Sequence, residues 1–340
     1  MLSCQPDSAI DDCTDRHSVS LGRTGLTRNT ITCYKKPMNP TYPFDRPVII
    51  LAAPRSGSTL LFETLALSPD LWTIGGESHG IFERIKRYNP NTEYCDSNAL
   101  YAEDSIPEVI DLIRQLFFQK LRDARGRSVQ SMNRGQLRPL RMLEKTPKNS
   151  LRVSLLNRIF PDALFIYLVR NPRDNISSII DAWNSGRFVT YPNLDGRQKP
   201  WSLLLPPGWQ SYHEAPVEEI AAFQWRSANE AILQELGKLD RNRWTAVSYG
   251  QQLNAGENTL VRLCEFCDIS ADGVVDSSAG GQSSHSRYTL SPPSPDKWQR
   301  HATALARVLP GLADTIELIK KFATDIPREE FDLSIEGAAD

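Results

Sequence analysis

The sequence lacks any long hydrophobic run. No stretch approaches the roughly 18 uninterrupted apolar residues typical of a membrane-spanning helix, so we predict no transmembrane segment. The first residues, MLSCQPDSAIDDCTD, also lack the basic and apolar stretches of a secretion signal. We therefore expect a soluble, cytoplasmic protein that does not bind membranes.

The chain also lacks an excess of charge of one sign. Its 39 Lys and Arg residues nearly balance its 41 Asp and Glu residues, which leaves a formal net charge of −2. Proteins that bind nucleic acids through bulk charge are strongly basic. The balance therefore argues against a nucleic-acid partner, while a local basic pocket stays compatible with it.

Cysteine is sparse and scattered, with six residues in 340, so the sequence contains no disulfide framework. Its C-x-x-C pair, Cys264 and Cys267, has no second pair of Cys or His at a spacing suited to zinc. We interpret both cysteines as small buried residues of a helix, and we predict no metal site.

Order is expected to begin at residue 47. Residues 1–46 are rich in Ser, Thr, Asp, Arg and Pro and show no periodicity, which predicts a poorly structured N-terminal segment. Short apolar runs then predict strands at 48–53, 71–74, 141–144, 164–169 and 244–247, and helical spacing predicts helices at 58–67, 107–122, 150–159, 173–183 and 216–239. This alternation predicts an α/β fold, a P-loop-like parallel sheet flanked by helices in a single domain over 47–330.

Residues 185–216 do not fit the alternation, because Pro and Gly recur there between aromatic residues. A connection this long inside a domain is usually functional or disordered, and the many aromatic residues argue against simple disorder. We predict that it is a lid or substrate-binding insertion, with a loop packed on the surface as the alternative. Its candidate substrate contacts are Trp201, Trp209, Tyr212 and His213.

The strongest local motif is Ala53–Thr59, APRSGST, which follows the first predicted strand and opens a helix. Successive backbone N–H groups at a helix N-terminus form an anion site. Hydroxyls from Ser56, Ser58 and Thr59 and the charge of Arg55 would add to it. The loop has no Lys at the position that the NTPase loop G-x-x-x-x-G-K-[ST] requires.

Three further polar clusters follow later strands. Arg170 and Ser178 lie in RNPRDNISSI, after the predicted strand that ends in LFIYLV, and Lys145 lies in EKTPK. Arg and Ser side chains that converge at the carboxyl end of a parallel strand predict a second phosphate site. The segment GGESH supplies two possible bases, Glu77 and His79, beside flexible glycines.

In this order, the four motifs resemble those of the PAPS-dependent sulfotransferases, where PAPS is 3′-phosphoadenosine 5′-phosphosulfate. PRSGSTLL is similar to that family's 5′-phosphosulfate loop, and FPDALFIYLVRNPRDNISSI is similar to its 3′-phosphate motif. The bacterial and tyrosylprotein sulfotransferase branch is the most similar. It has a Lys-x-Pro after a short strand, a Gly-x-Glu that supplies the base, and a Lys-Trp pair near the C-terminus, like Lys297-Trp298 here.

The resemblance implies roles for individual residues. The 5′-phosphosulfate would be held by Arg55, Ser56, Gly57, Ser58 and Thr59, and the 3′-phosphate by Arg170 and Ser178, with Lys297 and Ser286 as additional contacts. Tyr249 stands where the family often has a Tyr near the nucleotide. The family commonly follows that Tyr with an acidic pair, whereas this chain has Gly250-Gln251.

The implied reaction is transfer of the sulfuryl group from PAPS to a hydroxyl or amine of a small-molecule acceptor, such as a natural product, with release of PAP and without a metal. Glu77 would accept the proton, with His79 as its rival and His213 as a third candidate. Lys145 and Arg55 would stabilise the developing charge. The alternatives are a P-loop-type nucleotide kinase or NTPase, and a non-catalytic nucleotide-binding protein.

Overall fold

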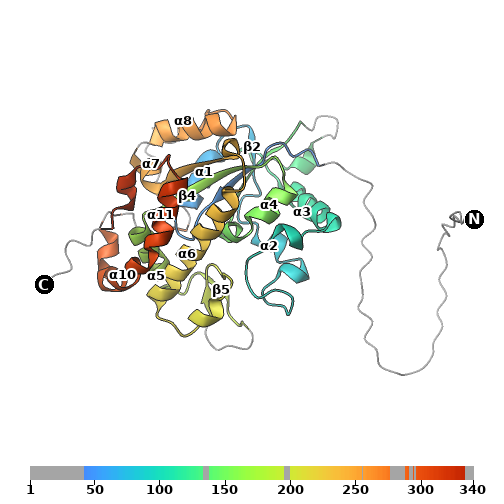
Figure 1. Ribbon diagram of the computed structural model, residues 1–340. Coiled ribbons are helices and arrows are strands. Elements are labelled where there is room, and N and C mark those ends of the chain that lie inside the picture. Colours follow the sequence, from blue (N-terminus) through green and yellow to red (C-terminus); the bar gives the residue numbers. More distant parts are fainter. Residues whose placement is uncertain are drawn as a thin grey trace, which may run out of the picture. The chain divides into compact units, whose positions relative to one another are not determined.

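A five-stranded parallel sheet forms the centre of the described structure (Figure 1). The computed structural model describes residues 42–132, 138–194, 200–254, 256–275, 288–290, 294 and 296–333. In sheet order, the strands are β2 (Leu71–Trp72), β3 (Arg141–Lys145), β1 (Val48–Leu51), β4 (Leu164–Val169) and β7 (Trp244–Ser248). All neighbouring pairs run parallel, which confirms the predicted α/β fold.

Helices cover both faces of this sheet. They are α1 (Ser58–Leu65), α2 (His79–Phe82), α3 (Pro107–Lys120), α4 (Val153–Ile159), α5 (Pro172–Asn184), α6 (Val217–Leu236), α7 (Tyr249–Asn254), α8 (Gly256–Cys267), α10 (Ala302–Val308) and α11 (Ala313–Phe322). Pro107 and Pro172 stand in the first turns of α3 and α5, where a missing N–H costs nothing. The predicted helix at 150–159 is instead a 3₁₀ helix, η5 (Pro147–Leu151), followed by α4.

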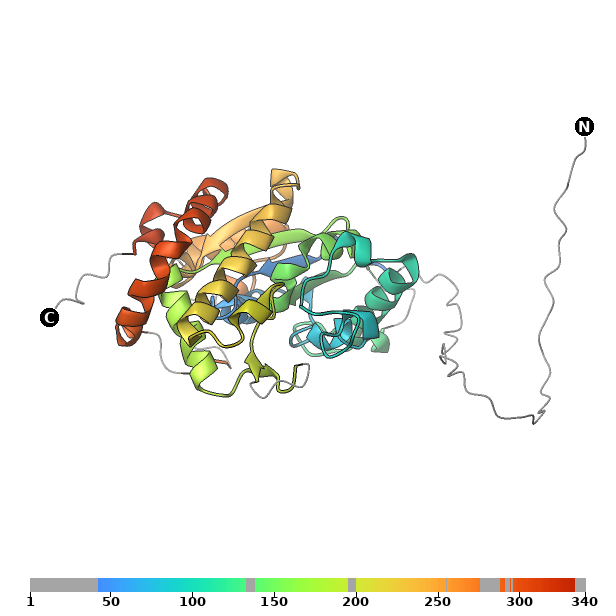
Figure 2. The same ribbon diagram turned by 60° about the horizontal axis from the view of Figure 1, so that its bottom comes forward.

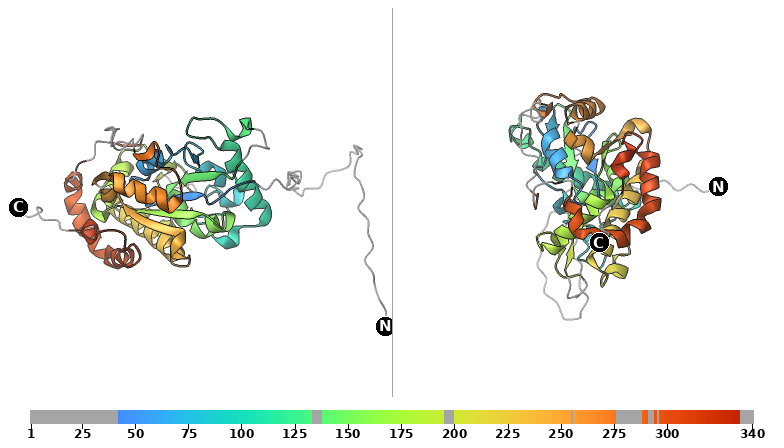
Figure 3. Two further views of the ribbon diagram at one scale, coloured as in Figure 1. Left: turned by 90° about the horizontal axis from the view of Figure 1, so that it is seen from above. Right: turned by 90° about the vertical axis from the view of Figure 1, so that its left-hand side faces the viewer.

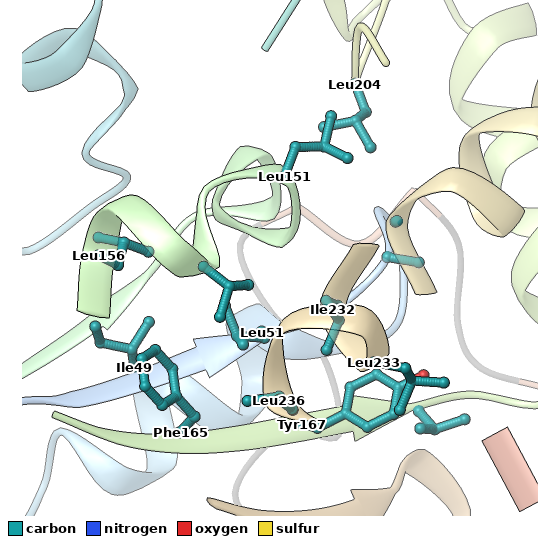
Figure 4. Close-up of a cluster of buried hydrophobic side chains, with 14 of the residues drawn as sticks. Ile49, Leu51, Leu151, Leu156, Phe165, Tyr167, Leu204, Ile232, Leu233 and Leu236 are labelled. Atoms are coloured by element: carbon teal, nitrogen blue, oxygen red, sulfur yellow. The ribbon is translucent and has the colours of Figure 1, made fainter. Parts of the chain in front are cut away.

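One face of the sheet packs against α4 and α6. Figure 4 shows Ile49 of β1 and Phe165 of β4 close to Leu156 of α4, and Tyr167 beneath Ile232 and other residues of α6. These strand residues alternate with residues that point to the other face, because successive side chains of a strand do so. The apolar runs in the sequence therefore reflect burial on both sides.

The opposite face packs against α1 and α8. Ile50 and Ile166 join a separate cluster with Leu61 of α1 and with Cys264 and Cys267 of α8. The two cysteines are buried free thiols on a helix, in agreement with the sequence interpretation. Burial raises the pKa of Cys267 to about 12.

The 185–216 insertion contains a small antiparallel pair, β5 (Val189–Tyr191) and β6 (Trp201–Ser202), and a 3₁₀ helix, η6 (Trp209–Tyr212). It has a hydrophobic cluster of its own with residues of α6. In Figure 2 it is the yellow-green segment beside α5 and α6. The C-terminal helices α10 and α11, in red in Figure 3, pack against α6.

The described part of the domain begins at Tyr42. Phe44 pairs with Leu140 and packs edge-on against Phe160, so residues 42–46 belong with the domain although their composition resembles that of the preceding segment. Residues 1–41, the rest of the predicted N-terminal segment, lie outside the described residues. Among the described helices, none is both long and apolar enough to span a membrane.

Candidate functional site

The segments that follow β1, β2, β3, β4 and β7 meet at a cavity of about 500 Å³. This is the edge of a parallel sheet at which ligands usually bind. Ten of the residues singled out in the sequence line it: Arg55, Gly57, Ser58, Thr59, Glu77, His79, Arg170, Ser178, Tyr249 and Lys297. The tertiary structure therefore brings together motifs that lie far apart in the chain.

The loop between β1 and α1 has a tightly curled backbone. Arg55 and Gly57 have positive φ values of 66° and 91°, and Gly57 is the N-cap of α1. A Cβ atom on Gly57 would lie 2.4 Å from Cδ2 of Tyr249. Glycine is therefore required for both the backbone angle and the close approach of the Tyr249 ring.

Ser56 and Asn175 fasten this loop to α5. The Ser56 hydroxyl is buried and lies 2.8 Å from both the carbonyl oxygen of Ala53 and Oδ1 of Asn175. Asn175 Nδ2 donates to the carbonyl oxygen of Pro54 at 2.8 Å. Ser56 thus holds the loop and does not line the cavity. Sequence reasoning missed Asn175, although it lies inside the RNPRDNISSI motif.

Three cations, Arg55, Arg170 and Lys297, border one part of the cavity. Arg170 Nη1 donates to the backbone oxygen of Arg55 at 3.0 Å, and its guanidinium lies 4.8 Å from the ring centre of Tyr249. Burial lowers the pKa of Arg55, and the like charge of Arg170 lowers it further. The Nε atoms of Arg55 and Arg170 are buried and have no hydrogen-bond partner among the described residues. Unpaired buried donors and mutual repulsion are the electrostatic conditions of an anion site.

Glu77 lies at the side of the cavity where Lys145 and His79 meet. Lys145 Nζ donates to Glu77 Oε1 at 2.8 Å and to Thr59 Oγ1 at 3.0 Å. His79 Nδ1 lies 3.7 Å from Glu77 Oε2, which is longer than a hydrogen bond. Burial raises the pKa of Glu77, but contact with His79 and the charge of Lys145 outweigh it and lower the pKa to about 2. Glu77 is therefore a carboxylate at neutral pH.

A second ion pair, which sequence reasoning missed, borders the same cavity. Lys148 Nζ donates to Glu83 Oε1 and to the Tyr191 hydroxyl, the latter at 2.9 Å. Burial lowers the pKa of Lys148, while Glu83 opposes that change. Tyr191 belongs to β5, so this pair joins the insertion to the segment after β3.

The four candidate substrate contacts of the insertion do not line this cavity. Trp201 and Trp209 are buried in the insertion's own cluster, and Tyr212 stacks on Phe223 with ring centres 4.1 Å apart. His213 lies 3.4 Å from Glu214. The insertion contributes other residues to the lining: Phe188, Val189, Thr190, Leu203 and Leu204.

Ser286 lies outside the described residues. Lys145 does not itself line the cavity, but it contacts two residues that do.

Within the described part of the chain, no group of three or more His, Cys, Asp or Glu side chains is arranged to hold a metal ion.

Comparison with known structures yields several proteins with low identity. The sulfotransferase domain of the Synechococcus PCC 7002 olefin synthase is 22% identical, with a TM-score of 0.48, and the match covers 86% of this chain and 99% of that one. Sulfotransferase STF9 from Mycobacterium avium is 16% identical, with a TM-score of 0.49 and coverage of 80% and 77%. Mouse sulfotransferase SULT7A1 complexed with PAP is 13% identical, with a TM-score of 0.38 and coverage of 84% and 92%.

Comparison with curated proteins gives no match. A family model does match the chain. It is the model of the sulfotransferase family, and it covers residues 47–273, which is more than half of the sequence and includes the loop after β1, Glu77, Lys145 and Arg170. The protein therefore belongs to the sulfotransferase family.

Proposed function

We propose that the protein transfers a sulfuryl group from PAPS to a hydroxyl or amine of a small-molecule acceptor. The observation that carries this proposal is the convergence of Arg55 and Arg170, with their unpaired Nε donors, on a cavity that is also lined by Glu77, the partner of Lys145. Membership of the sulfotransferase family favours sulfuryl transfer over the kinase or NTPase alternative.

The residues present fit the two phosphate-bearing ends of PAPS. The N-terminus of α1, with Arg55, Gly57, Ser58 and Thr59, would hold the 5′-phosphosulfate, and Ser56 would keep that loop in shape from behind. Arg170 and Ser178 would hold the 3′-phosphate, with Lys297 nearby. PAPS supplies an activated sulfuryl group on a good leaving group. The protein's task is therefore to place the reactants in line and to stabilise charge.

Glu77 would accept the acceptor's proton. A pKa of about 2 makes it a weak base at rest. However, an attacking hydroxyl becomes strongly acidic as its new bond forms, so an ionised carboxylate suffices for a late proton transfer. Lys145, which reaches both Glu77 and Thr59, would stabilise charge on the leaving phosphate and the sulfuryl oxygens.

His79 is the alternative base because it lines the cavity within 3.7 Å of Glu77. In that arrangement Glu77 would orient the imidazole. The acceptor would lie against the apolar wall of Phe188, Val189, Leu203 and Leu204, beside the Glu83–Lys148 pair. An apolar wall with few polar groups suits a small amphipathic molecule.

Calorimetry with PAP, 5′-AMP and ATP tests the nucleotide site. We expect PAP to bind tightly and ATP weakly, because Arg170 and Ser178 would contact a 3′-phosphate, which ATP lacks. Equal affinity for PAP and 5′-AMP would contradict the role of Arg170 and Ser178. Incubation with labelled PAPS and a panel of phenols, alcohols and amines then tests turnover. PAP binding without transfer to any of them would favour the non-catalytic alternative.

Single-turnover rates at saturating PAPS test the base. Glu77→Gln keeps the shape and removes the proton acceptor, so the rate should fall about 10²- to 10⁴-fold while PAP affinity is retained. His79→Ala should cost much less. The reverse result would transfer the role to His79, and near-normal rates in both variants would contradict a role for either residue as the base.

A further inference from the structure

A buried carboxyl group lies beside the loop that carries both candidate bases. Glu144 precedes Lys145 on β3, and its relative exposure is 0%. Because neighbouring residues of a strand point to opposite sides, Glu144 and Lys145 reach different partners. No step of the proposed function uses Glu144.

Its contacts converge on Ser78. Glu144 Oε1 accepts hydrogen bonds from the Ser78 hydroxyl at 2.5 Å, from Thr146 Oγ1 at 2.7 Å and from Asn149 Nδ2 at 3.0 Å. The backbone N–H of Ser78 donates to Thr146 Oγ1 at 2.7 Å. Ser78 is fully buried and is therefore held through both its side chain and its backbone.

Ser78 stands between Glu77 and His79 in the chain. The loop before it contains Gly75, with a φ of +75°, and Gly76, neither of which has a neighbouring atom within 4 Å of an added Cβ. The Gly75 N–H donates to Thr73 Oγ1 at 3.1 Å, but neither glycine has a side chain that would restrict the backbone. The position of Glu77 and His79 therefore depends on the contacts that hold the residue between them.

We propose that Glu144 is a positioning residue, whose Oε1 holds Ser78 and thereby fixes Glu77 against Lys145 and His79 at the cavity. Only the expected effect of this positioning on turnover rests on the proposed function. The placement of Glu77 is a property of the fold alone. The loop is then fixed from both sides of β3, by Glu144 through Ser78 and by Lys145 through Glu77.

The role requires an accepting oxygen rather than a charge. Burial raises the pKa of Glu144, which favours its neutral form, while hydrogen bonds from Ser78 and Thr146 and the charge of Lys145 act in the opposite direction. A neutral carboxyl or a carboxamide keeps an oxygen with two lone pairs, which can accept the two shorter hydrogen bonds, from Ser78 and Thr146. Glu144→Gln should therefore preserve the loop, and Glu144→Ala should release it.

The test follows the Glu77 carboxyl group by ¹³C NMR in the full chain, labelled at glutamate and assigned with Glu77→Gln. In the wild type we expect Glu77 to stay ionised down to about pH 4, because its pKa is about 2. In Glu144→Ala and Ser78→Ala, the pKa should rise toward the ordinary value of about 4.3, because the pair with Lys145 loosens. Loss of stability alone would not move this signal in a folded protein.

Two variants serve as controls. Glu144→Gln should keep the wild-type titration. Asn149→Ala removes a hydrogen bond to the same oxygen without touching the loop, so it should keep the wild-type titration too. An unchanged Glu77 pKa in both Glu144→Ala and Ser78→Ala would overturn the proposal. A shift in Glu144→Gln as large as in Glu144→Ala would also overturn it, in favour of an effect of charge.

Activity gives a second readout. Where the protein transfers sulfuryl groups, Ser78→Ala should lower the single-turnover rate by about 10- to 100-fold, as expected for a misplaced catalytic group, with PAP affinity within about threefold of the wild type. A shifted Glu77 pKa in a protein without any transfer activity would sustain the positioning role and contradict the proposed function instead.

Discussion

The two walls of the cavity are built in different ways. At the edge of the sheet, charged groups such as Arg55, Arg170 and Glu77 stand on short segments directly after strands. On the insertion, the lining is largely apolar, and the largest aromatic side chains pack behind it in a cluster of their own. The first wall is therefore suited to binding charge, whereas most of the insertion's aromatic side chains support the fold of the insertion itself.

The largest expected effect is a loss of stability caused by a substitution in the insertion. Trp209 is 1% exposed, and its Nε1 donates to the carbonyl oxygen of Asp96 at 2.7 Å. We expect Trp209→Ala to lower the free energy of unfolding in urea by about 3–5 kcal/mol, because it leaves a cavity in the cluster. PAP affinity should change by less than about threefold, because Trp209 does not line the site. A large loss of PAP affinity with normal stability would contradict the division between the two walls.

The next effect concerns pH at the sheet edge. The folded-state pKa of Glu77, about 2, lies below its ordinary value, so ionised Glu77 stabilises the fold above about pH 5. This contribution, on the order of 3 kcal/mol, is lost as the pH falls from about 5 to 2. We expect the stability difference between wild type and Glu77→Gln, measured in urea at pH 6, 4 and 3, to shrink with falling pH. A constant difference would contradict the ion pair with Lys145.

A smaller effect is expected on binding. Arg170→Ala should weaken PAP by about 10- to 150-fold, the value of a charge-assisted contact of roughly 1.5–3 kcal/mol, and should affect 5′-AMP much less. The matched control is Arg158→Ala, since Arg158 is exposed on α4. Calorimetry gives both affinities. Unchanged PAP affinity in a folded Arg170→Ala protein would remove Arg170 from the 3′-phosphate site.

The smallest effect, on the affinity for PAP, is expected from a substitution where the two walls meet. The Arg55 guanidinium of the β1–α1 loop lies 4.8 Å from the ring centre of Phe188, a residue of the insertion. Phe188→Leu keeps an apolar side chain but removes the aromatic ring. We expect PAP to bind about two- to fivefold more weakly, as the loss of a cation–π contact between two partly exposed side chains predicts. A loss above about 20-fold would mean that Phe188 contacts the nucleotide directly.

Much of the site could be predicted because its residues come directly after predicted strands. The apolar runs at 48–53 and 164–169 locate two central strands, and the segments after them, with Arg55 and Arg170, must meet at one edge of a parallel sheet. Ser56 could be recognised as part of the loop, but its buried contact with Asn175 could not, because that contact depends on how α5 packs.

The succession of strands and helices along the chain, the need for glycine at position 57 and the charged residues after strands follow from the residues alone, because periodicity, backbone angle and motif spacing are local properties. Which side chains face the cavity depends on the tertiary structure. All three of Trp201, Trp209 and Phe188 are aromatic residues of the insertion. The two tryptophans are buried behind the wall, whereas Phe188 lines the cavity. The tertiary structure also decided that Glu77 pairs with Lys145 while Glu144 pairs with Ser78, because residues 77–78 and 144–145 meet only when β2 and β3 lie side by side.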